Sequence, residues 1–179
     1  LSLDGKIVAI GSPYNNNYYS GSVRVFEWNT TNWIQLGNTI EGLSQGYSKG
    51  YSVSLSANGK IIDTPAHYTG PMLGGAFYSG YVKLYKLNET NINNKLWNQM
   101  GATIKNPRFN IDAQGTDGSG TSVSLSANGN IVAIGTPYNK KSSNSNVGCV
   151  RLYQYQLSIN TWVKLGQDID SLTTDDSSG

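Results

Sequence analysis

The chain has 179 residues, a net charge of +2, 13% charged residues and one cysteine. This low charge of either sign argues against a nucleic-acid-binding surface and against attraction to an anionic membrane. The single Cys149 excludes an internal disulfide and a paired-cysteine metal site, and no apolar run reaches the roughly 20 residues of a membrane span.

Three short motifs recur in the same order, which indicates three copies of one repeated unit. The first is Leu-Ser-x-x-Gly, anchored at Leu3, Leu55 and Leu125, and the letters SVSLSANG occur unchanged at 52–59 and 122–129. The second is Gly-x-Val-(Arg/Lys)-(Val/Leu)-(Phe/Tyr), at 21–26, 80–85 and 148–153. The third is Trp-x-(Gln/Lys)-(Leu/Met)-Gly, at 33–37, 97–101 and 162–166. The Trp residues are evenly spaced and the Leu anchors are not, so the length varies in the loops.

Each unit is predicted to form four strands, the last two being the second and third motifs. The alternation of polar and apolar residues at 52–56 and 122–126 is typical of a half-buried first strand. The Asn-Gly or Asp-Gly pair that follows predicts a tight hairpin in which both residues tolerate a positive φ. The next runs, 6–10 and 130–134, are continuously apolar, which predicts second strands that are buried on both faces.

The second unit departs from this pattern, because Asp63-Thr64-Pro65 stands where the other units have apolar residues. Asp and Pro are unfavourable inside a central strand. We therefore expect a shortened or bulged strand here, and a site with a purpose is the alternative.

No segment shows helical periodicity, so an all-β fold is predicted. A sheet whose inner strands are buried on both faces needs a sheet on each side, and radial repetition of such sheets gives a β-propeller. We predict a partial propeller of three four-stranded antiparallel blades, with blade 1 at 1–50, blade 2 at 51–120 and blade 3 at 121–179. Together they form one propeller segment.

The repeat resembles the FG-GAP-like, integrin-α-type propeller family. The resemblance rests on Gly-(Tyr/Thr)-Ser-Val-Ser-Leu-Ser-x-(Asn/Asp)-Gly, then Ile-Val-Ala-Ile-Gly-(Ser/Thr)-Pro and the second motif. It is closest to the variant with Trp-x-Gln-x-Gly in strand four, which implies a large extracellular or surface protein. Lys49-Gly50 and Ser119-Gly120 replace the family's Phe-Gly, and tight turns replace its calcium loop. The calcium site is therefore not carried over, because a two-residue turn cannot supply six to eight oxygen ligands.

Three blades are too few to close a ring of the usual four to eight. Two arrangements follow from this. Either further blades lie elsewhere in a longer gene product, or copies of the chain assemble, for example two chains that make six blades. The start inside a motif and without Met favours the first arrangement.

The residues offer no catalytic constellation, because His67 is the only histidine and no Gly-rich phosphate loop precedes a helix. We therefore expect a protein that is not an enzyme and that has no cofactor. No metal site is expected either, with Asp112 and Asp117 as weak candidates beside their simpler role as solvated turn residues. An enzyme acting on polysaccharide is the weakest alternative.

The recurring Trp residues suit packing, whereas the aromatic residues outside the repeat are candidates for ligand binding. They are Tyr14, Tyr18, Tyr19, Tyr68, Phe77, Tyr78 and Tyr138, all in the variable loops between strands two and three. Aromatic and Asn-rich loops on a rigid scaffold suit recognition of glycans or proteins by stacking and amide hydrogen bonds.

Two glycosylation sequons begin at Asn29 and Asn88, both just after the third strand of a unit. The leading hypothesis is a non-enzymatic extracellular or surface propeller that serves adhesion or acts as a structural building block. The alternative is a lectin-like module. The expected partners are other blades, further copies of the chain, glycans or surface proteins, with neither nucleic acid nor membrane insertion.

Overall fold

The computed structural model describes residues 1–15, 20–42, 48–66, 80–91, 93–105, 118–142 and 145–172. These residues form strands, turns and one short 3-10 helix, Leu157–Ile159. Within these ranges, no helix is long and apolar enough to cross a membrane. The prediction of an all-β fold is confirmed, and the finer prediction of propeller blades stays a prediction.

Each repeated unit forms its own antiparallel sheet. Sheet 1 contains β1 (Ile7–Ser12), β2 (Ser22–Trp28), β3 (Trp33–Gln35) and β4 (Ile40–Glu41). Sheet 2 contains β5 (Ser54–Leu55), β6 (Ile61–Ala66), β7 (Tyr81–Asn88), β8 (Leu96–Gln99) and β9 (Ile104–Lys105). Sheet 3 contains β10 (Val123–Leu125), β11 (Ile131–Thr136), β14 (Cys149–Gln156) and β15 (Thr161–Asp170). The hairpin of β12 (Lys140–Ser142) and β13 (Ser145–Asn146) extends from sheet 3.

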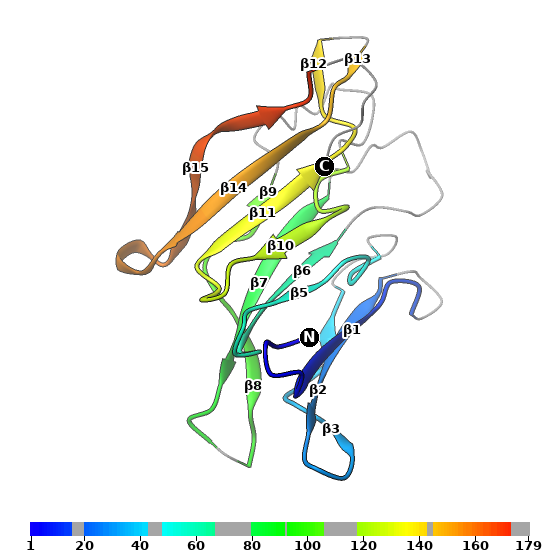
Figure 1. Cartoon of the computed structure of the whole chain (residues 1–179), viewed down its shortest axis with the longest axis vertical. Helices are drawn as coiled ribbons and strands as arrows, with labels where there is room; N and C mark the ends of the chain where they lie inside the picture. Colours follow the sequence, from blue (N-terminus) through cyan, green and yellow to red (C-terminus); the bar gives the residue numbers. More distant parts are fainter. Residues whose placement is uncertain are drawn as a thin grey trace.

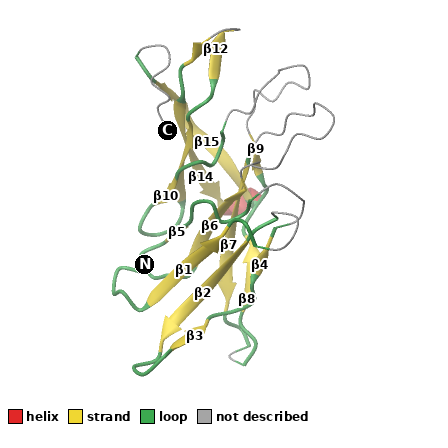
Figure 2. Ribbon diagram, turned by 90° about the vertical axis from the view of Figure 1, so that its right-hand side faces the viewer, coloured by secondary structure: helices red, strands yellow, loops and turns green. Residues whose placement is uncertain are grey.

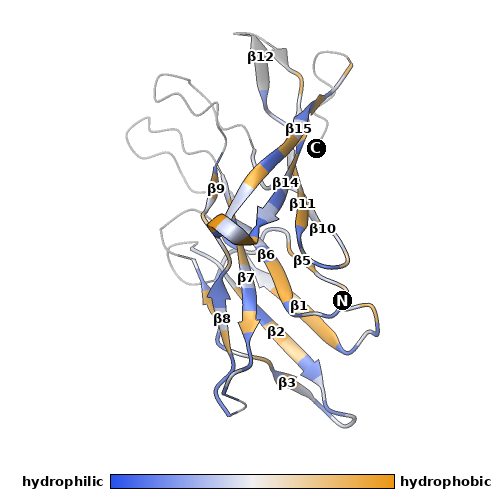
Figure 3. Ribbon diagram, turned by 90° about the vertical axis from the view of Figure 1, so that its left-hand side faces the viewer, coloured by the Kyte–Doolittle hydropathy of each residue, from blue (hydrophilic) through white to orange (hydrophobic). Residues whose placement is uncertain are grey.

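The three sheets follow one another along the long axis of the molecule. Figure 1 shows this order from sheet 1, in blue, to sheet 3, in yellow to red, and the side view of Figure 2 agrees. Figure 3 shows apolar residues along β1 and β11, the second strands of the first and third units. The successive sheets therefore stack face to face along this axis.

Two hydrophobic cores fill the two spaces between the sheets. Ile62 packs with Val23, Leu36 and other residues of sheet 1, and its neighbour Ile61 packs with Val132 of sheet 3. Successive side chains of a strand point to opposite faces, so β6 contributes to both cores. All six residues of β6 are buried. The sequence predicts second strands buried on both faces at 6–10 and 130–134. Four of the six residues of β11 are buried, whereas the prediction is wrong for β1, in which only Ile7 is buried.

The expectation of a shortened or bulged strand at Asp63-Thr64-Pro65 is wrong. The strand β6 pairs with β7 in continuous register from Ile61 opposite Lys86 to Ala66 opposite Tyr81. The Pro65 carbonyl accepts from the Gly50 N–H, on the side of β6 away from β7. The nitrogen and the carbonyl of one strand residue face the same side of the strand. Pro65 is therefore tolerated, because its missing N–H removes no hydrogen bond to β7.

The repeated letters build one particular turn in each sheet. In sheet 2 the Ser56 hydroxyl donates to Asn58 Oδ1 (2.8 Å) and accepts from the Ile61 N–H (3.0 Å), while the Gly59 N–H donates to the Ser56 carbonyl (2.8 Å). Ser2 and Ser126 make the same bonds in the other sheets.

Two details of the predicted hairpin need correction. In the described residues only the Gly of each turn has a positive φ, +71°, +69° and +72° in chain order, and the Asn or Asp before it does not. A turn closed by a side chain and a left-handed Gly therefore replaces the expected two-residue hairpin. Ser2 is equivalent to Ser56, so Leu1 rather than Leu3 has the place of Leu55.

The same turns connect neighbouring sheets. The Leu3 N–H donates to the Ala57 carbonyl (2.8 Å), and the Ala57 N–H donates to the Ala127 carbonyl (2.9 Å). A Cβ atom on Gly59 would lie 2.6 Å from Ile7 Cδ1, and one on Gly129 would lie 2.6 Å from Ile61 Cδ1. Gly59 and Gly129 therefore each make room for an isoleucine of the preceding sheet.

This arrangement predicts different costs for the same substitution in two turns. Gly5→Ala should lower the free energy of unfolding by about 1–2 kcal/mol, because an alanine must adopt a left-handed φ. Gly59→Ala should lower the free energy of unfolding by the same amount and by about 1–3 kcal/mol more, because the added methyl group overpacks against Ile7. Urea unfolding of both variants measures the difference, since their φ values match and nothing lies within 4 Å of a Cβ on Gly5. Equal losses would contradict the packing.

Candidate functional site

The Trp of strand four makes the same contact between both pairs of neighbouring sheets. The Trp97 indole N–H donates to the Leu36 carbonyl (2.8 Å), and the Trp162 indole N–H donates to the Met100 carbonyl (2.8 Å). We call this contact the indole joint. Each joint connects a Trp to the residue that precedes the strand-four Gly of the preceding sheet.

The strand-four Gly gives the indole its space. A Cβ on Gly37 would lie 2.7 Å from Trp97 Cδ1, and one on Gly101 would lie 3.0 Å from Trp162 Cδ1. Both glycines have left-handed φ values, +78° and +74°, which favour glycine independently of the space. The Gln side chain of the motif donates to the carbonyl of the same Gly, at 3.1 Å from Gln35 and 2.9 Å from Gln99.

The residues of the two indole joints are buried, whereas the equivalent residues on the outer faces of sheets 1 and 3 are exposed. Trp97 and Trp162 are 4% and 8% exposed, whereas Trp33 of sheet 1 is 45% exposed. On the acceptor side Leu36 and Met100 are 5% and 8% exposed, whereas Leu165 of sheet 3 is 41% exposed. The prediction that the recurring Trp residues pack is confirmed for Trp97 and Trp162, whereas Trp33 lies exposed beside Trp28, with ring centroids 5.5 Å apart.

A groove with amide side chains lies between sheets 2 and 3. It has a volume of about 570 Å³ and is lined by Lys86, Leu87, Asn88, Glu89, Thr90, Asn98, Gln99, Met100, Tyr155 and Asn160. We call it the amide groove. The Tyr155 hydroxyl donates to Asn160 Oδ1 (2.7 Å), and the Tyr155 ring packs on Trp162 with centroids 5.3 Å apart. The amide groove thus presents an aromatic ring and amide groups, and Tyr155 connects it to Trp162 of the second indole joint.

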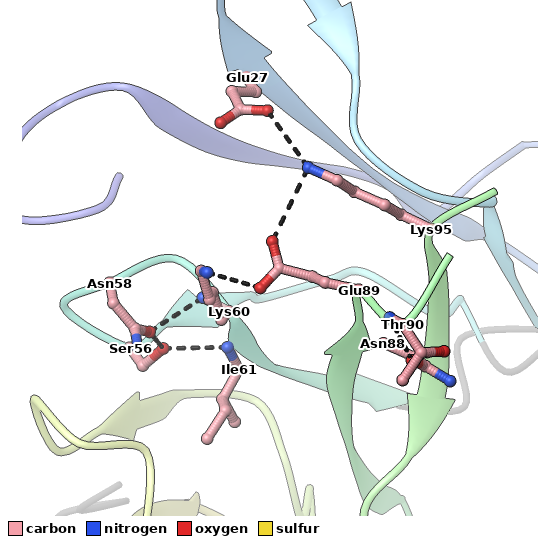
Figure 4. Close-up of polar contacts among 9 residues, drawn as sticks. All are labelled: Glu27, Ser56, Asn58, Lys60, Ile61, Asn88, Glu89, Thr90 and Lys95. Atoms are coloured by element: carbon pink, nitrogen blue, oxygen red, sulfur yellow. Dashed lines mark hydrogen bonds and ion pairs between the residues drawn. The ribbon is translucent and has the colours of Figure 1, made fainter. Parts of the chain in front are cut away.

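A second groove has the equivalent position between sheets 1 and 2. It has a volume of about 420 Å³ and is lined by Glu27, Ile34, Gln35, Leu36, Gly37, Asn38, Asn93, Asn94, Lys95 and Leu96. Beside it, Lys95 Nζ lies 4.0 Å from Glu27 and 3.7 Å from Glu89, and Lys60 also pairs with Glu89 (Figure 4). These lysines hold the pKa of Glu89 below its ordinary value.

The two sequon asparagines lie in turns that leave their side-chain nitrogen available. Asn29 Oδ1 accepts from the Thr31 and Asn32 N–H groups, and Asn88 Oδ1 accepts from the N–H and hydroxyl of Thr90. Figure 4 shows the Asn88–Thr90 contact. Glycosylation at both positions stays a prediction.

Sequence reasoning placed the ligand site in other segments. Tyr14 and Tyr138 are exposed, but neither lines the amide groove. The remaining candidates lie outside the described residues, namely Tyr18, Tyr19, Tyr68, Phe77, Tyr78, Asp112 and Asp117, as does His67. The groove residues Asn98, Tyr155 and Asn160 were missed, because only the stacking of sheets brings these hairpins together.

Two ionisable side chains, Lys49 and Asp63, are fully buried. Lys49 Nζ donates to the Tyr85 hydroxyl (3.1 Å) and lies 4.9 Å from the centre of that ring. Burial lowers the pKa of Lys49 to about 7. Asp63 Oδ1 accepts from the Ser54 N–H (2.7 Å), and burial raises the pKa of Asp63 to about 8. Lys49 lies where the resembling family has a Phe, and burial of the position is preserved.

An ion-pair network holds Asp168, one of the acidic residues beside Cys149. The Arg151 guanidinium is buried and donates to Asp168 Oδ2 (3.0 Å) and Asn139 Oδ1 (3.1 Å). Burial raises the pKa of Asp168, but hydrogen bonds and charges from Lys164 and Arg151 outweigh it and hold that pKa below its ordinary value. Within the described ranges, Cys149, Asp168 and Asp170 are the group whose metal-ligand atoms lie close together. Within this group, Arg151 and Lys164 both pair with Asp168.

Comparison with known proteins supports the fold. No family model matches the chain. No curated protein matches it in sequence. A solved structure from Bacteroides uniformis ATCC 8492, described as a "putative 6-phosphogluconolactonase", is similar with a TM-score of 0.55 at 15% identity. The match covers 98% of this chain and 40% of that chain, so this chain spans less than half of that protein.

This similarity corrects the expectation that the chain is not an enzyme. The protein with the similar fold is described as an enzyme, so the all-β architecture does not argue against catalysis. At 15% identity the similarity shows the fold alone, and the lactonase description belongs to the other protein.

The buried Asp63 predicts an unusual pH dependence of stability. Its pKa rises from 3.8 to about 8 on folding, so the folded state binds more protons than the unfolded state between these values. The free energy of unfolding should therefore fall as the pH rises from about 4 to 8, by a few kcal/mol relative to Asp63→Asn. Urea unfolding of both proteins across this range measures the effect.

Asp4→Asn is the control for the direction in which the free energy of unfolding changes with pH. The Ser2 hydroxyl and the Lys6 N–H hold the pKa of Asp4 below its ordinary value, so this carboxylate stabilises the fold above that range and the contribution is lost only in acid. A constant difference between the wild type and Asp63→Asn from pH 4 to 8 would contradict a neutral, buried Asp63.

Proposed function

We propose that the chain forms three consecutive blades of a β-propeller and serves as a building or adhesion module of a larger assembly on a cell or particle surface. The observation that carries this proposal is the repetition of the indole joint between both pairs of sheets. A joint that repeats with constant geometry is typical of repeat architectures, in which each unit contacts its neighbours. The resemblance to FG-GAP-like repeats is consistent with this proposal.

The two ends of the stack support a role in assembly. At its outer face sheet 1 exposes Ile10 and Trp33, and sheet 3 exposes Val163, Leu165 and Ile169. Contiguous exposed apolar residues mark interaction surfaces. Further sheets of the same kind would cover both ends.

The proposal predicts that the native particle is heavier than one chain of 19.3 kDa. Native mass spectrometry of the protein from its source, compared with the denatured chain, distinguishes further blades in one polypeptide from several associated chains. A native particle that is a single 19.3 kDa chain without other blades would contradict the proposal.

The amide groove favours a second candidate function, recognition of a glycan. Sugars bind through stacking of a ring on an aromatic side chain and through hydrogen bonds to planar amides. Tyr155 supplies the ring, and Asn98, Gln99 and Asn160 supply amides in the lining of the same groove.

A glycan array tests this second candidate. Asn98→Ala should weaken binding of a retained glycan about tenfold, the effect of losing one or two hydrogen bonds of about 1 kcal/mol each. Asn130→Ala is the matched control, because Asn130 is an exposed asparagine outside the amide groove. Absence of binding to any glycan, or an equal loss in the control, would contradict it.

A further inference from the structure

The two end faces of the stack carry complementary halves of the contacts that connect the sheets. Trp33 is an exposed donor, and Leu165-Gly166 has the acceptor position that Leu36-Gly37 and Met100-Gly101 have in the filled joints. Gly166 has a φ of +72°, like the two joint glycines, and nothing lies within 4 Å of a Cβ built on it. The space for an indole ring is therefore already formed on sheet 3.

The turn contacts are complementary as well. In the series that connects the turns, each N–H donates to the next sheet, so within the described part of the chain the series ends with the Leu3 carbonyl on sheet 1 and the Ala127 N–H on sheet 3. Gly59 and Gly129 pack on Ile7 and Ile61 of the preceding sheet, whereas nothing lies within 4 Å of a Cβ on Gly5.

The partner for that vacancy lies on the opposite end face. Ile131 is the equivalent of Ile7 and Ile61, which are both buried, but it is only half-buried. Gly5 on sheet 1 thus offers the space, and Ile131 on sheet 3 offers the side chain. All three unfilled contacts have one half on each end face.

We propose that sheet 3 of one chain binds sheet 1 of a second copy, head to tail. This inference rests on the proposed role as a building module and names its partner. In the complex, the Trp33 indole of the second copy donates to the Leu165 carbonyl and lies over Gly166. At the same interface, the Ala127 N–H donates to the Leu3 carbonyl of the second copy, and Ile131 packs against its Gly5.

Two copies joined in this way bring six sheets together, a number within the usual range of closed propellers. The contact is heterologous, since different patches of each copy meet, and such contacts close into a ring when the rotation allows it. The expected species is a ring of two chains.

Sedimentation velocity of the 179-residue chain at micromolar concentration tests the proposal. The expected mass is twice 19.3 kDa. Trp33→Ala and Leu165→Asp should each weaken association about tenfold or more, as substitutions of a central aromatic or of an apolar contact do. Trp33→Phe, which keeps a ring without the indole N–H, should weaken association less than Trp33→Ala.

Mixing the two variants gives the decisive result. Trp33→Ala keeps an intact acceptor face and Leu165→Asp keeps an intact donor face, so an equimolar mixture should regain a complex with one copy of each. Ile159→Asp is the control, because Ile159 is an exposed apolar residue of the 3-10 helix outside the joint. Circular dichroism of each variant checks that it folds.

Three outcomes would overturn the proposal. They are a wild type that stays monomeric, variants that associate like the control, and a mixture that remains as weak as its components, which would indicate a symmetric contact. The module function fails separately, because it requires only that the native particle contain further blades of any origin.

Discussion

The indole joint is the contact on which the rest of the architecture depends. From each of sheets 2 and 3, one Trp crosses to the preceding sheet, donates to a carbonyl in front of a glycine and buries the Leu or Met that carries this carbonyl. A buried carbonyl without a donor costs free energy, so the indole N–H both satisfies it and fixes the position of the ring. Because Trp97 also belongs to the core between sheets 1 and 2, and Trp162 to the core between sheets 2 and 3, the joint sets how the sheets pack. The amide groove depends on the indole joint too, since the ring of Tyr155 packs on the ring of Trp162.

Much of the fold follows from the repeat. The period-two pattern and the even spacing of Trp33, Trp97 and Trp162 predicted the strands and a packing role for the Trp residues. What the pattern could not predict is which atoms the repeated letters use. Ser56 closes its turn through hydrogen bonds of its own hydroxyl group, and residue propensities for strands and turns do not describe such bonds. Asp63 and Pro65 suggested a broken strand, yet β6 is regular. The Pro65 nitrogen and carbonyl face Gly50 and not β7, and the Asp63 carboxyl group accepts a hydrogen bond from the Ser54 N–H. The Ser56 bonds are local but belong to side-chain geometry, whereas Asp63 and Pro65 depend on Ser54 and Gly50, which only the folded sheet brings beside them.

The candidate site was harder to predict for the same reason. Loop aromatics are conspicuous in a sequence, whereas Asn98, Tyr155 and Asn160 belong to ordinary strand and hairpin positions. They form one groove only because sheets 2 and 3 stack with their outer hairpins side by side. The buried Lys49 is a similar case. It occupies a position that is apolar in the resembling family, and it is accommodated by the ring and hydroxyl of Tyr85.

Hydrogen exchange of the four indole N–H groups, followed by NMR in dilute solution and assigned by single Trp→Phe substitutions, tests the central claim most directly. A buried, hydrogen-bonded N–H exchanges only when the structure opens. The indole joint predicts slow exchange for Trp97 and Trp162 and fast exchange for Trp28 and Trp33. Comparable exchange rates for all four indoles would show that the Trp residues do not hold the sheets together and would contradict the account.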